Sequence, residues 1–197
     1  LEASFIDEEF LYELIEELVV RMFSLGDIDL PRPFPRMTWR EAMDTMGSDK
    51  PDTRFGLRFV DATDIFRNTT YGIFRQIIDR GGCIKGINIP NQSEKLSKNV
   101  LQNEYAKEIV PSFGAKGMTW MRVHGDKLES NIVQFFSTEE QVAIRERFKA
   151  GNGDVIIMIA DASYEIVTSA LGELRLHLAR RLDLIPPDCF SPLWVTD

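Results

Sequence analysis

Apolar residues near the N-terminus recur at helical spacing. The repeat places one on each successive turn, and neighbours widen the stripe: Phe10, Leu11, Leu14, Ile15, Leu18 and Met22. Asp7 stands at the start of this repeat and Gly26 just after it, so the pattern predicts a helix with a side-chain cap and a glycine stop. The opposite face carries Glu8, Glu9, Glu13, Glu16 and Glu17. We interpret these carboxylates as a solvated helix face, favoured by the dipole in the first turn, in preference to a cation site.

A proline-rich connector at residues 31–35 leads to a second, shorter helix. Thr38 and Glu41 have the spacing of a capping box, and Gly47 marks the predicted end of the helix. The charged residues 48–52 that follow have no periodicity. They predict a turn, and because no structural pattern explains these residues, they are candidates for a functional role.

From about Tyr71 the pattern changes to short strands alternating with helices. Runs of apolar or alternating residues predict strands at 82–90, 118–123 and 154–160. Helices are predicted at 97–109, at 138–149 with a capping box formed by Thr138 and Gln141, and at 166–182. This order is satisfied by an α+β two-layer sandwich, in which a mostly antiparallel sheet packs against two main helices.

The composition is that of an ordinary globular chain. Of its 197 residues, 44% are hydrophobic and 27% are charged. A run of about 18 apolar residues, as a membrane span needs, is absent, and the first residues are acidic where a secretory signal would be basic. Cys83 and Cys189 have no CxxC partner, which argues against zinc and against a disulfide framework, so we expect a reducing cytoplasm. The net charge of −8 repels phosphate backbones, so any contact with nucleic acid must be local.

The residues that could carry chemistry are few. The two histidines, His124 and His177, lack metal-ligand spacing, and we interpret Glu173, one turn before His177, as its partner in a surface pair. No metal site is predicted. The run Gly151-Asn152-Gly153-Asp154 precedes a strand, whereas a phosphate-binding loop follows a strand and opens a helix, so we predict a hairpin-like turn.

One basic cluster falls on the predicted helix at 166–182. Arg175, Arg180 and Arg181 could meet an RNA backbone there. The competing interpretation is the polar side of an amphipathic helix, where late cations also favour the C-terminal dipole. No aromatic residues for base stacking are interleaved with these arginines, as a dedicated RNA binder would have.

Five runs of residues resemble a single family, in the family's order. They are PFPRMTWREAM at 33–43, GSDKPD at 47–52, RFG at 54–56, GAKG at 114–117 and PLWVTD at 192–197. The chain is similar in these runs to the bacterial-type aspartyl-tRNA synthetase, a class II family, and the resemblance covers almost all of it. It implies an internal fragment that begins at the end of motif 2, ends in a strand before motif 3, and contains the GAD insertion domain between them.

The resemblance implies a division into three parts. Residues 1–66 would be a catalytic-domain segment, 67–187 the GAD domain, and 188–197 a return strand of the catalytic domain. An insertion must leave and re-enter its host at neighbouring points. We therefore expect residues 60–64 and 187–194 to lie side by side, with the strand at 193–195 joined to the catalytic-domain segment.

The resemblance also implies the chemistry of the full-length enzyme. That enzyme would activate aspartate with ATP and Mg²⁺ and charge tRNA(Asp), with tRNA(Asn) as an open alternative, and would be a homodimer without membrane contact. Glu2 matches a glutamate that lines the family's substrate pocket. The fragment itself would hold no catalytic residue, cofactor or metal, because the motif arginines that hold ATP are not in it.

Two other functions remain open at this stage. A GAD module of a tRNA-dependent amidotransferase subunit would bind or position its partner without catalysis, but it has no need of the runs at 33–56 and 192–197. An acidic protein-interaction domain would explain the charge and none of the motifs. One departure from the family is visible at 109–112, which resembles a short insertion.

Overall fold

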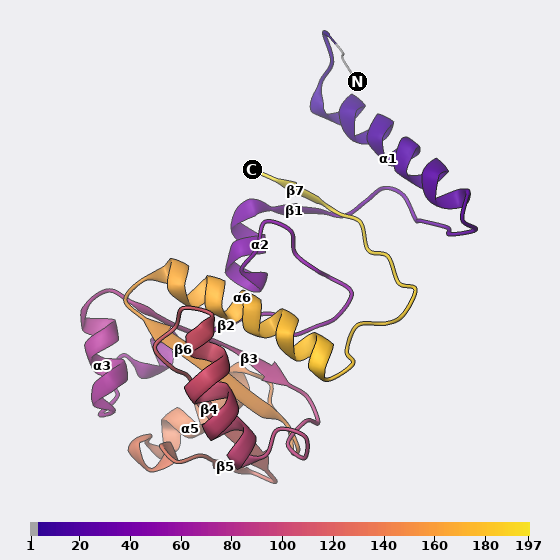
Figure 1. Ribbon diagram of the computed structural model, residues 1–197. Coiled ribbons are helices and arrows are strands. Elements are labelled where there is room, and N and C mark those ends of the chain that lie inside the picture. The colour runs from indigo at the N-terminus through magenta and orange to yellow at the C-terminus, as the bar shows by residue number, and fades with distance from the viewer. Residues whose placement is uncertain (1–3) are drawn as a thin grey trace.

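The computed structural model describes residues 4–197 and begins with a helix that stands apart from the rest (Figure 1). This helix, α1, spans Glu8–Ser24. Its first turn is capped as predicted, because the Asp7 carboxylate accepts the amide of Phe10 at 2.9 Å. Within residues 4–197, none of the helices is both long and apolar enough to cross a membrane.

A small parallel sheet connects α1 to the remainder of the molecule. Strand β1, Arg36–Thr38, pairs with β7, Trp194–Thr196, so that Met37 lies opposite Val195. Helix α2, Trp39–Met46, follows β1 directly, and Thr38 accepts the amide of Glu41 at 3.0 Å. The predicted cap and the return of the C-terminal strand to the N-terminal segment are both confirmed.

The docking of α1 differs from the prediction. Glu16 is only 3% exposed, and its carboxylate accepts hydrogen bonds from the Phe34 amide at 3.1 Å and the Trp194 indole at 3.0 Å. The interpretation of a fully solvated acidic face is therefore wrong at Glu16. By contrast, the apolar side chains of Leu18 and Met22 are 50% and 61% exposed. Helix α1 thus contacts the small sheet through Glu16 and through the Tyr12 ring, whose centroid lies 4.8 Å from that of Trp194, and leaves much of its apolar stripe open.

The larger sheet has five strands in the order β2-β3-β6-β4-β5, all paired antiparallel. These strands span Val60–Asp61, Cys83–Ile89, Val155–Asp161, Thr119–His124 and Lys127–Glu129. The central pair β3–β6 runs over seven residues of each strand, from Cys83↔Asp161 to Ile89↔Val155. An α+β fold with a mostly antiparallel sheet is thus confirmed.

Helices cover both faces of this sheet, so the structure adds a layer to the predicted two. Helix α6, Tyr164–Arg181, packs on one face together with the π-helix η2, Val100–Ile109. On the other face lie α3, Gly72–Asp79, and α5, Thr138–Arg147. Two short 3₁₀ turns, η1 at Thr63–Phe66 and η3 at Val133–Phe135, complete that side. Along β6, Ile157 faces the α6 core and Ile156 the opposite core, which explains the continuous apolar run of this strand.

The segment that resembles an insertion coincides with widened helical turns. The Val110 amide donates to the Tyr105 carbonyl, five residues earlier, whereas an α-turn joins residues four apart. A short α-helix, α4 at Val110–Ser112, follows, and Gly114 leaves it with a φ of +93°. A π-turn holds one more residue than an α-turn, so η2 accommodates extra length without a loop.

The cap of α5 lies one residue before the predicted one. Ser137, with extended backbone, accepts the Glu140 amide at 3.1 Å, and the Glu140 carboxylate accepts the Ser137 amide at 2.7 Å. Both Ser137–Glu140 and the predicted Thr138–Gln141 have capping-box spacing. The backbone conformation decides between them, since Thr138 is already helical.

The larger sheet begins before the predicted boundary at residue 67. Strand β2 pairs with β3, and Phe55, Leu57 and Phe59 belong to the core beneath α6. The outgoing and returning chains touch where the Thr53 hydroxyl lies 2.7 Å from the Ser191 hydroxyl. The crossing contact thus lies at residue 53, earlier than the predicted 60–64.

Candidate functional site

Arg175 is buried, contrary to its predicted place on an exposed basic face. Its side chain is 1% exposed, and its guanidinium group donates to backbone carbonyls. The acceptors are Asp52 at 2.7 Å, Phe55 at 3.1 Å, Gly56 at 2.9 Å and Leu57 at 3.1 Å. Burial lowers the pKa of Arg175 to about 10, so the group stays charged at neutral pH.

This arrangement explains how residues 52–57 are held. The run has an irregular backbone, with Leu57 at a φ of +61°, and its carbonyls have no strand or helix partner where Arg175 reaches them. Five guanidinium donors in a planar fork suit several carbonyls at once, and the Phe55 ring packs 4.1 Å from the guanidinium carbon. Arg175 therefore fixes residues 52–57, which include the family-like run RFG at 54–56, onto α6.

Arg180 and Arg181 remain at the surface, where they line a shallow hollow. Arg181 forms a two-pronged ion pair with Glu104 at 2.8 Å, and Arg180 is exposed. Phe113, Glu173 and His177 complete the lining of this hollow, whose volume is about 430 Å³. The three predicted arginines thus separate into one buried residue and an exposed pair.

His177 does not pair with Glu173 among the described residues. Its ring packs edge-on against Tyr105, with centroids 5.7 Å apart, and its Nε2 atom is buried without a described hydrogen-bond partner. Burial and the charge of Arg181 lower the pKa of His177, which favours the neutral ring. The predicted Glu–His pair is wrong.

His124 has an acidic partner that its sequence spacing did not suggest. Its Nε2 atom lies 3.0 Å from Glu129, which also pairs with Arg122 at 2.8 Å and Lys98 at 2.5 Å. Chiefly through the hydrogen bond from Lys98, the pKa of Glu129 is held below its usual range. Within residues 4–197 no three His, Cys, Asp or Glu side chains gather as metal ligands would.

The turn at 151–154 is structural in its contacts. The Asp154 carboxylate, 6% exposed, accepts from the Gly151 amide, the Asn91 amide and the Asn88 side chain, each at 2.9 Å. These bonds tie the turn to the end of β3. Its polar groups serve the fold, which agrees with the predicted hairpin-like turn.

A second, half-buried junction joins α2 to the larger sheet. The Lys85 ammonium, from β3, lies 2.9 Å from the Asp44 carboxylate, which also accepts the Tyr164 hydroxyl at 2.5 Å. Burial and this hydrogen bond raise the pKa of Tyr164. Nearby, a Cβ on Gly47 would stand 2.2 Å from the Thr168 carbonyl, so α2 and α6 approach closely only because residue 47 is glycine.

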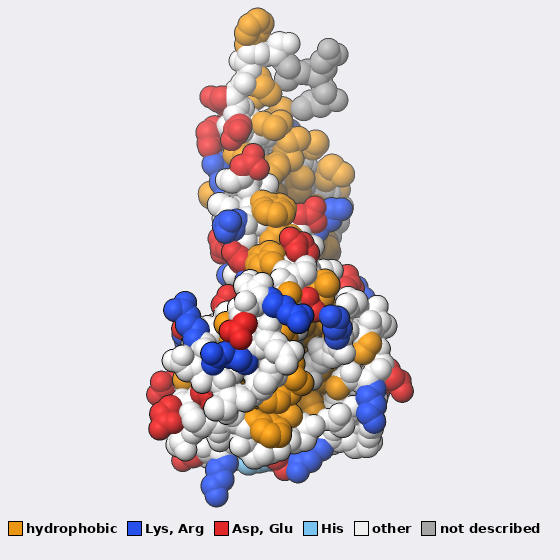
Figure 2. All heavy atoms as spheres, turned by 90° about the vertical axis from the view of Figure 1, so that its left-hand side faces the viewer, with side chains coloured by type: hydrophobic (Ala, Val, Ile, Leu, Met, Phe, Trp, Pro, Cys, Tyr) orange, Lys and Arg blue, Asp and Glu red, His pale blue; other side chains and the backbone are white. Residues whose placement is uncertain are grey.

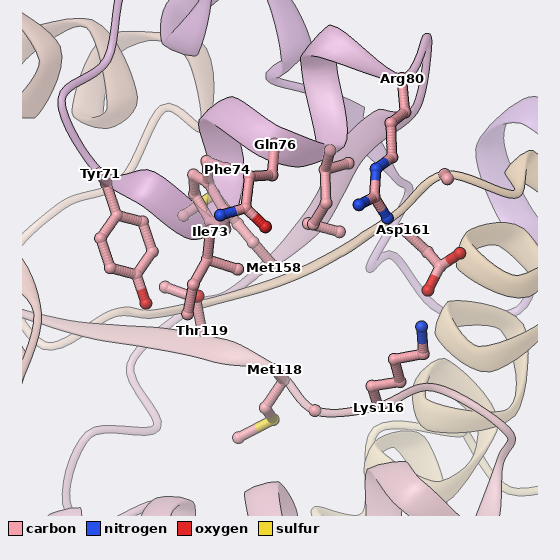
Figure 3. Close-up of a pocket in the computed structure, with 14 residues that line it drawn as sticks. Tyr71, Ile73, Phe74, Gln76, Arg80, Lys116, Met118, Thr119, Met158 and Asp161 are labelled. Carbon is pink, nitrogen blue, oxygen red and sulfur yellow. The ribbon is translucent and has the colours of Figure 1, made fainter.

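One cleft has an open, mixed lining that sequence reasoning missed. It lies between α3 and the ends of β4 and β6, and its volume is about 430 Å³ (Figure 3). In Figure 3, Tyr71, Ile73 and Phe74 stand at one end, Met118 lies near the middle, and Arg80, Lys116 and Asp161 stand at the other end. The only signal in the sequence was the GAKG run at 114–117, which contains Lys116.

The cleft exists because two paired strands separate. The β4–β6 ladder ends at Thr119↔Met158. Continuing its register would place Lys116 opposite Asp161, yet these side chains form no ion pair within 4.0 Å among the described residues. The chains diverge where Met118 precedes β4, and α3 covers the gap. The charged groups therefore face an opening instead of each other.

Glu2, the predicted substrate-pocket residue, lies outside the described residues. Both cysteines, Cys83 and Cys189, are free thiols and half-buried. Burial is the largest cause of a raised pKa of the Cys83 thiol, and the nearby carboxylates of Asp61 and Asp161 raise it further. Because a thiol with a raised pKa is mostly protonated at neutral pH, Cys83 is not an activated nucleophile.

Comparison with known proteins agrees with the resemblance in the sequence. Residues 74–171 match the GAD domain family. The chain aligns with Aspartate--tRNA(Asp/Asn) ligase 1 of Syntrophus aciditrophicus at 69% identity, with Aspartate--tRNA(Asp/Asn) ligase of Aquifex aeolicus at 43%, and with Aspartate--tRNA ligase of Geobacillus kaustophilus at 39%. Each alignment covers 100% of this chain, which spans only 27%, 32% and 33% of the respective relatives. The chain therefore belongs to the aspartate–tRNA ligase family and corresponds to the part of it that contains the GAD domain.

Proposed function

We propose that this chain is a non-catalytic part of an enzyme that activates aspartate with ATP and Mg²⁺ and transfers it to tRNA. The observation that carries the proposal is the extent of the alignment. Relatives named as aspartate–tRNA ligases match all 197 residues, including the flanks of the GAD match at 74–171. The amidotransferase alternative requires no such flanks and is not favoured.

Contacts between the flanking segments and the GAD region support a structural role for the flanks. Arg175 of α6 holds the carbonyls at 52–57, and Lys85 of β3 holds Asp44 of α2. Besides these two contacts, the GAD region and the N-terminal segment share a core, because Phe55, Leu57 and Phe59 are buried with residues of α6. We propose that the GAD domain is thereby held firmly against the catalytic domain of the whole enzyme.

We propose the division into residues 1–66, 67–187 and 188–197, in which the first segment also contributes a strand to the sheet of the second. Strand β2, in the first segment, contributes to the sheet of the second. Residues 1–66 and 188–197 would then complete the catalytic domain, where Glu2 would line the substrate pocket. The parallel pair β1–β7 supports this, because it joins the two flanking segments to each other.

The partners proposed for the whole enzyme follow from the same family. They are tRNA(Asp), with tRNA(Asn) as a second substrate to be tested, together with aspartate and ATP. A homodimer in the cytoplasm is the proposed state. Arg180 and Arg181 are the proposed tRNA contacts in this chain, whereas Arg175 serves the fold.

Aspartate-dependent pyrophosphate exchange tests the proposal. The 197-residue chain should give no exchange above a control without protein, because it spans only 27% to 33% of the length of the relatives that it matches. The full-length protein that contains this sequence should catalyse exchange with aspartate and not with asparagine. Exchange by the chain alone would refute its non-catalytic role. Absence of aspartate-dependent exchange by the active, folded full-length protein would refute the ligase assignment.

A further inference from the structure

The cleft beneath α3 separates charged from apolar side chains along its length (Figure 3). Arg80 from the end of α3 and Lys116 approach one end from opposite walls, with Asp161 between them in the view. Phe74, Met118 and Met158 form the middle and the other end, where the Tyr71 hydroxyl also points inward. A ligand that fits this lining must therefore have a charged head and an apolar body.

The charged end holds groups of both signs that do not neutralise one another. Arg80, Lys116 and Asp161 form no ion pair within 4.0 Å with any described residue. One Asp161 oxygen accepts the Ser163 amide at 2.9 Å, which fixes the carboxylate and leaves its second oxygen free of described partners. Two cations and one carboxylate held apart are complementary to a ligand that carries both an acid and an amine.

The apolar end is continuous with exposed hydrophobic surface. Ile73 is 58% exposed and Phe135 48%, and the Tyr71 ring stacks on Phe135 with centroids 5.4 Å apart. Figure 2, which faces the side that carries α3, shows hydrophobic side chains in a band between lysines and arginines. An apolar side chain entering the cleft would be desolvated against Phe74 and Met118, while its head stays at the charged end.

We propose that this cleft binds a small zwitterion with an apolar side chain, such as an aliphatic or aromatic α-amino acid. Arg80 and Lys116 receive its carboxylate, and Asp161 receives its ammonium group. The ligand-sized volume of about 430 Å³ accommodates such a molecule. This site is separate from the catalytic role proposed for the whole enzyme and does not depend on it.

The test is a titration of the 197-residue chain with L-leucine, in which binding is monitored through the amide chemical shifts in NMR spectra. We expect saturable shifts at Gly117, Thr119 and Ala160, with a dissociation constant on the order of 1 mM, since the cations are exposed. The single-charge analogues 4-methylpentanoate and isoamylamine should each bind about tenfold more weakly or not at all. Glycine, which lacks the apolar side chain, should give no saturable shifts.

Variants of the charged residues test which side chain receives which charged group of the ligand. Asp161→Asn keeps an oxygen for the Ser163 amide, so it should fold and lose the preference for L-leucine over 4-methylpentanoate. The double variant Arg80→Gln/Lys116→Gln should lose both ligands. Arg75→Gln, also on α3 but paired with Asp79 outside the cleft, is the matched control and should bind L-leucine normally.

Three results would overturn the proposal. Absence of saturable shifts with L-leucine would show that the cleft is not a site for such ligands. Equal binding of 4-methylpentanoate and L-leucine would reduce it to an anion site. Equal binding of glycine and L-leucine would exclude any role for the apolar end.

Discussion

At the residue scale, Arg175 is buried and structural, although the exposed arginines near it on the helix suggest a binding surface. It lies on the same helix as Arg180 and Arg181, but only Arg175 faces inward. It belongs to the buried side of α6, together with Leu174 and Leu178. A buried charge persists where hydrogen bonds replace water. The four carbonyls of residues 52–57 provide that replacement.

Replacing this residue tests its structural role. Arg175→Met keeps much of the apolar stem but leaves the carbonyls of residues 52–57 without a donor, so it should lower the free energy of unfolding by about 3 kcal/mol. Arg180→Met, at an exposed position on the same helix, should change it by less than about 0.5 kcal/mol. Urea unfolding of both variants measures the difference. Equal stabilities would contradict the role of Arg175 as a clamp.

The exposed pair Arg180 and Arg181 carries a different prediction. In the full-length enzyme, Arg180→Gln/Arg181→Gln should raise the KM for tRNA and leave aspartate-dependent pyrophosphate exchange unchanged. Two lost phosphate contacts should also reduce the slope of log affinity against log salt by about 2. Glu108→Gln, an exposed change on the same side of the sheet domain, provides a control. Unchanged tRNA kinetics with normal folding would remove these arginines from the tRNA surface.

At the element scale, α1 packs through the buried Glu16 and through two aromatic pairs, Tyr12–Trp194 and Phe23–Phe190, while part of its predicted apolar stripe stays open. Glu16 accepts hydrogen bonds from the segment before β1 and from Trp194 of β7, and Arg32 also approaches it at 3.5 Å. Meanwhile the exposed Leu18 and Met22 have no covering element among the described residues. Because the chain spans about a third or less of the length of its relatives, we propose that this apolar stripe contacts another part of the whole protein.

The attachment of α1 should depend on pH through Glu16. Burial alone would raise the pKa of Glu16, but hydrogen bonds from Trp194, Phe34 and Arg32 outweigh it and lower the pKa. A lowered carboxyl pKa stabilises the docked state above the ordinary glutamate value of about 4.3, and this contribution is lost as the pH falls through the folded value. The stability difference between wild type and Glu16→Gln should therefore shrink with acid.

The Trp194 indole N–H resonance reports this docking directly. In wild type it should move as the pH falls below about 4, whereas in Glu16→Gln it should stay constant over the same range. Glu17→Gln, at an exposed ion pair with Arg21 on the same helix, should behave as wild type. A wild-type resonance that does not respond to acid would contradict the assignment.

At the scale of the whole molecule, the sheet domain is larger than its family match. Aromatic and aliphatic residues at 55–59 cover one side of the core, and the chains meet at Thr53 and Ser191. A chain of residues 53–191 should therefore unfold cooperatively. A chain of residues 70–186 should lose more than about 3 kcal/mol, because Phe55, Leu57 and Phe59 bury apolar surface against α6. Equal unfolding midpoints in urea would show that residues 53–69 and 187–191 add no stability to the sheet domain.

Local patterns in the sequence determined most elements of this protein. The caps at Asp7 and Thr38, the stop at Gly47 and the strand and helix order from residue 82 to 182 depend on side chains a few positions apart, so they are visible without a fold. The family-like runs likewise indicated the ligase family. Short pieces such as α3 and β5 lacked a distinct period and were not predicted.

Only the tertiary structure decided what the residues face. The burial of Arg175 and Glu16, the second helical layer and the cleft at Arg80, Lys116 and Asp161 each join segments far apart in the chain. A helical period reveals that a helix has two sides, but not which side finds a partner. That choice depends on how the whole chain satisfies its buried polar groups and covers its apolar surface, and no local window contains it.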